Sequence, residues 1–276
     1  MSLQEEVSTL FLQVLHSSPL EDSDITKEDV DAFLQEDLPV VDQYKEPDLK
    51  VVGYPSHPLY LAISARLCQW METGNCPVDK LPKHNLLEET NSTLTSTDVR
   101  TQTGDRLKDL YVGWASFSGS ERIDKLEGIL KLLGRRGLMN LLGMRRTVGS
   151  KDLWPPPRST LENTFNSKHR PDNIKPCDLT TGARALSKHC HRDVTVSWWG
   201  TAKGPVAKQN DHAFKVVTRI LDEATWINIH SLPNEVLILE IRQQDGYGAR
   251  WSHDGLNFRG FVEPMMENGH EVGWRH

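Results

Sequence analysis

The sequence predicts an α+β protein in which a helical N-terminal half precedes C-terminal helices packed on a small antiparallel β-meander. Apolar residues recur at the three- and four-residue spacing of helices in most of the chain before residue 225. The pattern then changes to short runs of β-forming residues, separated by the turn dipeptides Asp245-Gly246 and Asp254-Gly255. Helices followed by strands are typical of α+β domains rather than of a parallel α/β sheet.

Three helices are expected in the N-terminal region. The apolar face of the first helix ends at Pro19, and a second, short helix begins near Ser23 or Asp24. Pro58 suits the first turn of a third helix, because proline needs no backbone donor there, and Gly74 suits its end. The head of the chain is therefore predicted to be helical.

The middle of the chain is predicted to contain a loop and two further helices. Residues 75–104 hold prolines and a Thr/Ser/Asn cluster, which indicates a surface loop. Helices are expected at 105–117 and 120–133, with a capping box that starts at Ser118. Gly134 is expected to end the second of them.

The predicted organisation has three parts. Residues 1–50 contain 13 acidic and 3 basic side chains and form an acidic helical head. A helical region follows at 51–153. Three prolines at 155–157 forbid a helix and mark the start of an α+β C-terminal module at 154–276.

Two helices and three strands are expected in the C-terminal module. One helix covers 182–191, and Pro205 opens another whose inner face reaches Ala224. The strands are predicted at 235–241, 247–252 and 256–262.

Composition excludes several classes of protein. No apolar stretch approaches the roughly 20 residues of a membrane span, and the N-terminus lacks a signal segment. The four cysteines are too widely spaced for a disulfide scaffold, so we expect reduced thiols in a cytoplasmic or nuclear protein. An acidic head on a mildly basic body does not suggest a nucleic-acid binder. We therefore expect no nucleic-acid partner, no membrane partner and no cofactor.

The C-terminal part holds most of the chemically versatile side chains. Seven of the eleven histidines and five of the eight tryptophans lie beyond residue 188, which predicts a histidine-rich polar pocket. The candidate catalytic residues are His191, His230, His270 and Glu271. The candidate ligand-binding residues are Arg184, Lys188, Asn228, Arg250, Trp251, Arg259, Trp274 and Arg275.

These candidates depend on predicted local geometry. A helix over 182–191 places Arg184, Lys188 and His191 on one face, either as an anion-binding surface or as a solvated basic face. The loop at 226–230 alternates, so that Asn228 and His230 point to one side.

The meander and the tail supply the remaining candidates. Arg250 and Arg259, on neighbouring strands, could clamp an anion, or could instead pair with Glu240 and Glu263. The tail at 269–276 is expected to fold back onto the meander and complete the pocket.

Metal chelation has weak support. His189 and His191 lie two residues apart in a predicted helix and so point in different directions. We predict no metal site, although His230, His270 and a carboxylate remain an alternative set.

Several of these segments share a pattern with other proteins. The segments are 182–186, 188–189, 246–251, 258–264 and 269–276. They resemble a family of uncharacterised eukaryotic proteins to which no activity is assigned. The resemblance covers roughly the last 120 residues, so it implies one C-terminal module and no mechanism.

Two functions fit these expectations. The first is a binding or adaptor protein, because aromatic and arginine residues dominate protein interfaces and the acidic head could dock a protein partner. The second is an enzyme that uses histidine acid–base chemistry on a small phosphate- or carboxylate-bearing substrate.

Overall fold

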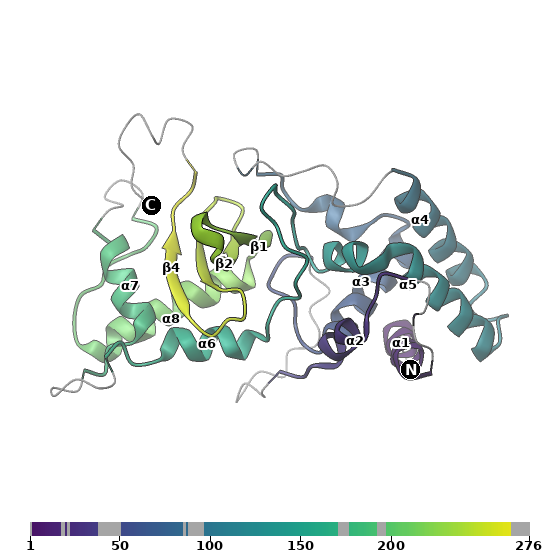
Figure 1. Cartoon of the computed structure of the whole chain (residues 1–276), viewed down its shortest axis with the longest axis horizontal. Coiled ribbons are helices and arrows are strands. Elements are labelled where there is room, and N and C mark those ends of the chain that lie inside the picture. Colours follow the sequence, from purple (N-terminus) through teal and green to yellow (C-terminus); the bar gives the residue numbers. More distant parts are fainter. Residues whose placement is uncertain are drawn as a thin grey trace. The chain divides into compact units, whose positions relative to one another are not determined.

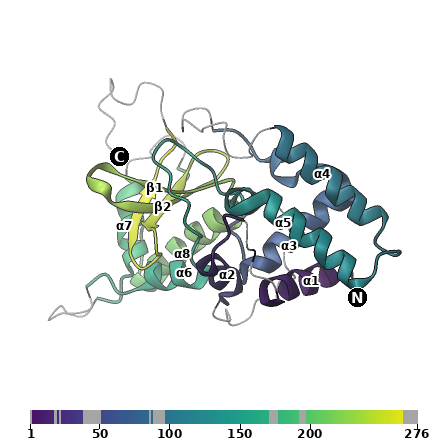
Figure 2. The ribbon, with the colours of Figure 1, turned by 45° about the vertical axis from the view of Figure 1, so that its right-hand side comes forward.

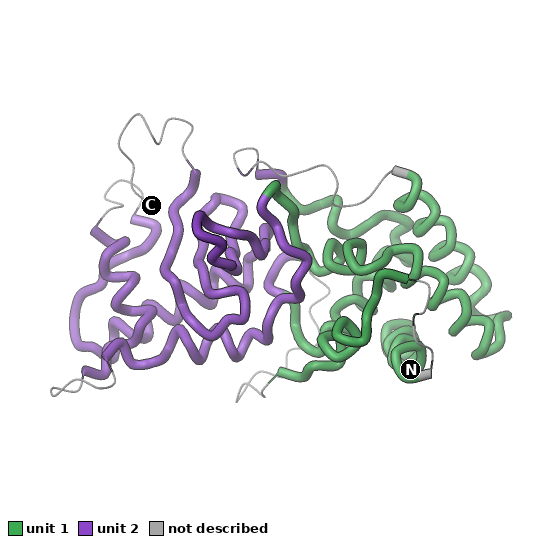
Figure 3. The backbone as a smooth tube through the Cα atoms, viewed as in Figure 1, with its two compact units in different colours: residues 1–51, 55–82, 89–148 green, residues 52–54, 83–88, 149–276 purple. Residues whose placement is uncertain are grey.

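The computed structural model describes residues 2–17, 20, 23–37, 51–84, 87, 97–170, 177–191 and 197–265. The chain divides into two compact units (Figure 3). Unit 1 comprises residues 1–51, 55–82 and 89–148, and unit 2 comprises residues 52–54, 83–88 and 149–276. The described part confirms the predicted α+β class, with helices first and an antiparallel sheet near the C-terminus.

Unit 1 is helical. Its α-helices are α1 (Leu3–Ser17), α2 (Lys27–Leu34), α3 (Leu59–Thr73), α4 (Thr97–Val112) and α5 (Gly119–Leu141), with a short 3-10 helix, η1 (Pro77–Lys80). Helix α1 packs against α3 and α5, and α4 packs against α3 and α5 (Figures 1 and 2). Fully buried side chains such as Phe11, Phe33 and Leu67 fill the space between these helices.

Two helices of unit 1 differ from their predicted bounds. Helix α4 begins at Thr97 inside the polar cluster that predicted a loop, and Asp98 in its first turn offsets the poor helix propensity there. Helix α5 begins at the predicted Ser118 cap but continues past Gly134, where φ is +59° and the helix is kinked. The Asp24 carboxylate accepts the backbone N–H of Arg135 at 2.8 Å, so the chain can resume its helix.

Unit 2 places three helices on a four-stranded sheet. The helices are α6 (Arg158–Asn166), α7 (Thr181–His189) and α8 (Val206–Asp222). The strands are β1 (Trp226–Ser231), β2 (Leu237–Arg242), β3 (Gly248–Ser252) and β4 (Phe258–Val262), with a 3-10 turn η3 (Pro233–Glu235) between β1 and β2. Helix α8 packs on β2 and β3, while α6 and α7 pack on β4 (Figures 1 and 2).

The sheet is an antiparallel meander in the order β1-β2-β3-β4. The turns at Gly246 and Gly255 use positive φ angles, as the Asp-Gly pairs predicted. The segment 226–230, which was expected to be a loop, is the edge strand β1, and it pairs with β2 along its whole length. Ile227 and Ile229 are buried as predicted, but Trp226 and Asn228 of the same strand are buried as well.

Helix α6 was not predicted. The three prolines that precede it seemed to exclude a helix, but Pro157 lies just before the first helical residue, where its fixed φ and missing donor cost nothing. Leu161 and Phe165 anchor the helix, and the Phe165 ring packs against Phe258 of β4 with 4.9 Å between centroids. Among the described residues, no helix has the length and apolar character needed to cross a bilayer.

Candidate active site

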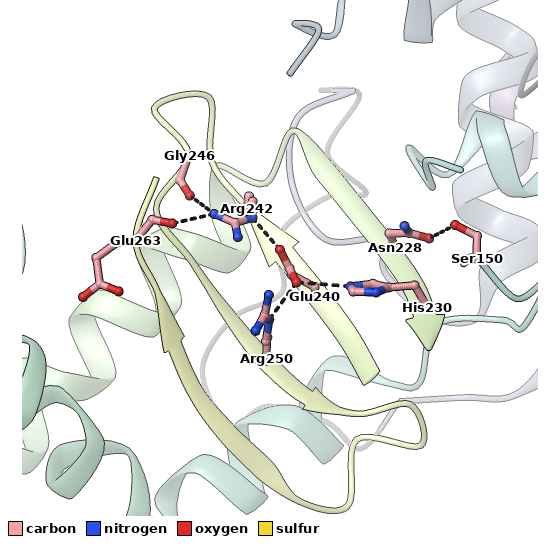
Figure 4. Close-up of polar contacts among 8 residues, drawn as sticks. All are labelled: Ser150, Asn228, His230, Glu240, Arg242, Gly246, Arg250 and Glu263. Atoms are coloured by element: carbon pink, nitrogen blue, oxygen red, sulfur yellow. Dashed lines mark hydrogen bonds and ion pairs between the residues drawn. The ribbon is translucent and has the colours of Figure 1, made fainter. Parts of the chain in front are cut away.

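One face of the sheet is apolar, and the other carries a cluster of polar side chains beside the buried Trp226 and Ile238. Register alignment places Asn228, Glu240 and Arg250 side by side on β1, β2 and β3, with His230 and Arg242 two residues along their own strands. We call these five residues the polar face (Figure 4). The opposite face carries the core residues that meet α6, α7 and α8, so the polar side chains are excluded from that core.

Glu240 lies at the centre of the polar face, and its side chain is 2% exposed. One oxygen accepts from Arg242 Nε at 2.5 Å, and the other accepts from Arg250 Nε at 2.7 Å. The second oxygen also lies 3.2 Å from His230 Nε2. Burial alone would raise the pKa of Glu240, but the His230 hydrogen bond and the two arginine charges outweigh it and hold that pKa well below its usual range.

The two arginines that bind Glu240 have different surroundings. The side chain of Arg242 is 1% exposed, and its Nη1 donates to the backbone oxygens of Gly246 and Glu263 at 2.6 and 2.8 Å. Arg242 therefore ties the β2–β3 turn to the end of β4. Arg250 is 25% exposed, and within the described part of the chain only its Nε makes a hydrogen bond.

His230 is the other partly exposed member, with 17% of its side chain accessible. Its Nε2 faces Glu240, so an N–H at this position donates to the carboxylate and leaves the lone pair on Nδ1. Residues 149–151 support this end of β1 from outside. Ser150 bridges to His230 through the backbone, and its Oγ donates to Asn228 Oδ1 at 2.7 Å.

A second buried pair lies on the core side of the sheet. His189 Nδ1, at the end of α7, is 2.5 Å from Glu263 Oε1, just beyond β4. The His189 ring also packs against Trp199 and Phe261. Sequence reasoning gave neither residue this role, because 74 positions separate them along the chain and no local pattern links them.

The structure brings together only part of the predicted site. His230, Asn228 and Arg250 share the polar face, although Asn228 itself is 1% exposed. Arg250 pairs with Glu240, which was one of the two alternatives considered for it. The other expected pair does not form, since Glu263 contacts His189 rather than Arg259, which is exposed on β4.

The remaining predicted residues lie elsewhere. Arg184 and Lys188 are exposed on α7, but the helix ends at His189, so His191 lies in an exposed turn and not on their face. Trp251 is fully buried, and its Nε1 donates to the Leu161 oxygen at 3.2 Å, so its indole belongs to the core rather than to a ligand surface. Four candidates lie outside the described residues: His270, Glu271, Trp274 and Arg275.

Within the described ranges, no group of three or more histidine, cysteine or carboxylate side chains has the geometry to hold a metal ion. His230 faces Glu240 and the two arginines, and His270, the second histidine of the alternative metal set, lies outside those ranges.

Residues 168–263 match a protein family described as the CdiA C-terminal tRNase toxin domain. This segment contains α7, α8, the whole sheet and every member of the polar face. No curated protein and no solved structure matches the chain. The matched segment covers about a third of the sequence, so the chain is similar to this family over its C-terminal part.

The match corrects four expectations. The C-terminal pattern resembles a family with a named activity, so the resemblance to a family without one was wrong. An adaptor, a protein-interaction module or a ligand-binding pocket is not what this family indicates, and neither is an enzyme for small anions. The prediction of no nucleic-acid partner is overturned as well, because tRNA is the named substrate of the family. The charge balance misled that prediction, because residues 168–263 hold 13 basic and 11 acidic side chains and their net charge does not mark a nucleic-acid partner.

Proposed function

We propose that the C-terminal part of this chain is a ribonuclease that cleaves tRNA, and that the polar face is its active site. The observation that carries the proposal is that the family match spans all five residues of the polar face. A carboxylate, an imidazole and a partly exposed guanidinium converge there within hydrogen-bonding distance. Such groups are the ones that phosphodiester chemistry requires.

RNA carries its own nucleophile. When the ribose 2′-oxygen attacks the adjacent phosphorus, a base takes the 2′-hydroxyl proton and the bond from phosphorus to the 5′-oxygen breaks. An acid then protonates the departing 5′-oxygen. The products are a 2′,3′-cyclic phosphate and a 5′-hydroxyl end, and the extra negative charge of the transition state needs a nearby cation.

His230 is assigned to proton transfer. With Nε2–H donated to Glu240, its Nδ1 has the lone pair that can accept the 2′-hydroxyl proton. Glu240 itself is a poor base because its pKa is lowered and its oxygens already have three donor partners. It orients His230 and stabilises the imidazolium that forms, as a carboxylate beside a catalytic histidine does in other hydrolases.

Arg250 is assigned to the phosphate. Its Nε is fixed by Glu240, which leaves the terminal nitrogens of the partly exposed guanidinium to meet a phosphate oxygen pair. The charges support this role. Arg242 and Glu240 neutralise each other inside the sheet, and Arg250 is the cation in excess.

The test is cleavage of purified tRNA by the whole chain and by three variants. His230→Ala should lower the rate by roughly 100- to 10,000-fold, the usual contribution of a proton-transfer residue. Arg250→Met should also abolish most activity, whereas Arg250→Lys should restore little because lysine lacks the planar fork. His253→Ala, a part-buried histidine in the β3–β4 turn, is the matched control and should cleave at the wild-type rate.

Product ends and thermal unfolding complete the test. The 5′ fragments should end in a cyclic phosphate, and all variants should remain folded. His230→Ala and Arg250→Met should lose some stability, because each removes a partner of the buried Glu240. A wild-type chain that leaves tRNA intact would refute the function. A His230→Ala variant that cleaves normally would refute the site while leaving the function standing.

A further inference from the structure

A basic surface lies on the outer side of α7, away from the polar face. It consists of His169, Arg170, Arg184 and Lys188, which we call the α7 basic cluster. Arg184 and Lys188 are one turn apart and exposed on α7. The buried side of the same helix, which includes Leu186 and His189, packs toward the core.

Backbone pairing brings the other two members to the start of this helix. Lys168 forms an antiparallel bridge with Thr180, the N-cap residue of α7. The His169 N–H donates to the Leu179 oxygen at 2.9 Å, and the Thr181 N–H donates to the Ser167 oxygen at 2.8 Å. His169 and Arg170 are therefore held beside the first turn of α7.

The charges of the cluster are not neutralised within the described residues. Arg170, Arg184 and Lys188 form no ion pair there, and the nearby Asp178 is taken by Lys168 at 2.9 Å. Burial lowers the pKa of His169, and the charges of Arg170, Arg184 and Lys188 lower it further. The same three charges therefore act on the His169 imidazole.

Local clustering of basic side chains matters for RNA binding because residues 168–263, which match the family, are nearly neutral overall. Residues 168–263 hold 13 basic and 11 acidic side chains, so net charge alone provides little attraction for RNA. Sequence-independent RNA binding depends instead on lysine and arginine side chains that contact phosphates. A compact group of unpaired cations is the feature that such contacts require.

We propose that the α7 basic cluster binds the phosphate backbone of the RNA substrate at a point remote from the scissile bond. This inference rests on the proposed ribonuclease function. Helix α7 packs on the core side of β4, and β4 is an edge strand of the sheet. In the proposed path, an RNA that lies across the polar face and passes round this edge meets the cluster next, whereas a dinucleotide occupies the polar face alone.

The cluster therefore gives a preference for long, folded RNA over short RNA. Its loss should weaken binding without affecting the chemical step. The alternative is that an acidic protein segment binds the α7 basic cluster. In that case, removal of the cluster's charges would not change RNA binding.

The experiment compares two charge-reduced double variants of the whole chain. Arg184→Gln/Lys188→Gln removes one arginine and one lysine from the cluster. Arg106→Gln/Lys108→Gln removes the same two charges from exposed positions on α4 in unit 1 and is the control. Binding of tRNA is measured by fluorescence anisotropy across a salt series, with His230→Ala added to prevent cleavage, and cleavage of tRNA and of a dinucleoside monophosphate is measured separately.

Removal of two phosphate contacts should weaken tRNA binding by on the order of tenfold at 0.1 M salt. The slope of log Kd against log salt should fall by roughly 1.5. The kcat/KM for tRNA should fall in parallel, while the dinucleotide is cleaved at the wild-type rate. The control should match the parent in every assay.

The outcomes separate the two proposals. Unchanged tRNA affinity and salt slope in the α7 variant would overturn the inference, even if the wild-type chain cleaves tRNA. Equal losses with tRNA and the dinucleotide would also overturn it, because the cluster would then support the fold or the chemistry. If the chain binds tRNA through the cluster but cleaves neither substrate, the inference holds and the ribonuclease function fails.

Discussion

Replacement of Glu240 by Gln removes the negative charge that Arg242 and Arg250 share while keeping the shape of the side chain. Arg242 is 1% exposed and cannot turn to water, so its charge becomes buried and uncompensated. Breaking a buried ion pair in this way costs about 3–5 kcal/mol. Arg250 is a quarter exposed and adds less, because solvent screens its charge.

The expected loss in the free energy of unfolding is about 3 kcal/mol at pH 7, or roughly 10 °C in the unfolding temperature for a unit of this size. The loss should depend on pH. Because the pKa of folded Glu240 is lowered, its contribution to stability is complete above the ordinary glutamate pKa of about 4.3. It disappears as the pH falls below that value toward the folded pKa, by up to about 1.4 kcal/mol per pH unit.

Urea unfolding, followed by circular dichroism and tryptophan fluorescence from pH 7 down to about pH 3, measures both quantities. Other carboxylates also titrate in this range, so the informative quantity is the difference between the variant and the wild type. Glu235→Gln, at an exposed position between β1 and β2, is the matched control. The reasoning is refuted if Glu240→Gln and Glu235→Gln unfold at the same urea concentration at pH 7. It is also refuted if the difference in unfolding free energy between Glu240→Gln and the wild type does not shrink as the pH falls.

Two further substitutions test the packing of each unit. Trp251→Ala removes a fully buried indole and should lower the free energy of unfolding by about 3–5 kcal/mol, measured by chemical denaturation; a loss below 1 kcal/mol would place this side chain outside the core. Gly134 has a positive φ, and Gly134→Ala would put a Cβ 2.5 Å from Asp24 Oδ1. The unfolding temperature should therefore fall further in this variant than in Gly74→Ala. Gly74 has a similar φ but open space around it, and its substitution should cost only about 1 kcal/mol, so equal drops would contradict the steric argument.

The meander was predictable because its determinants are local. Asp-Gly pairs select tight hairpin turns, and the strands between them alternate by simple period-two rules. The same rules aligned Glu240 with Arg242 and placed Arg250 on the next strand, so the ion pair could be anticipated. Local patterns also gave the caps of α3 and α5.

The errors arose where a local signal had two physical outcomes. The three prolines at 155–157 were interpreted as a break in helical structure. However, Pro157 has a fixed φ that suits the residue just before the first turn of α6. Segment 226–230 was expected to be a loop although its residues alternate, and pairing with β2 along six positions makes it a strand. The His189–Glu263 pair depends on how α7 folds back on β4, which no short-range pattern encodes.

The polar face also illustrates why a residue type cannot by itself separate structure from function. Arg242 and Arg250 each donate from Nε to the Glu240 carboxylate, at 2.5 and 2.7 Å. The turn that follows β2 and the end of β4 bring two backbone oxygens to Nη1 of Arg242, whose side chain is 1% exposed, so this guanidinium serves the fold. Arg250 has no such cover within the described residues and keeps donors that can face an anion. The difference lies in the neighbouring backbone, and it makes Arg250 rather than Arg242 the residue whose replacement should abolish cleavage while leaving the sheet intact.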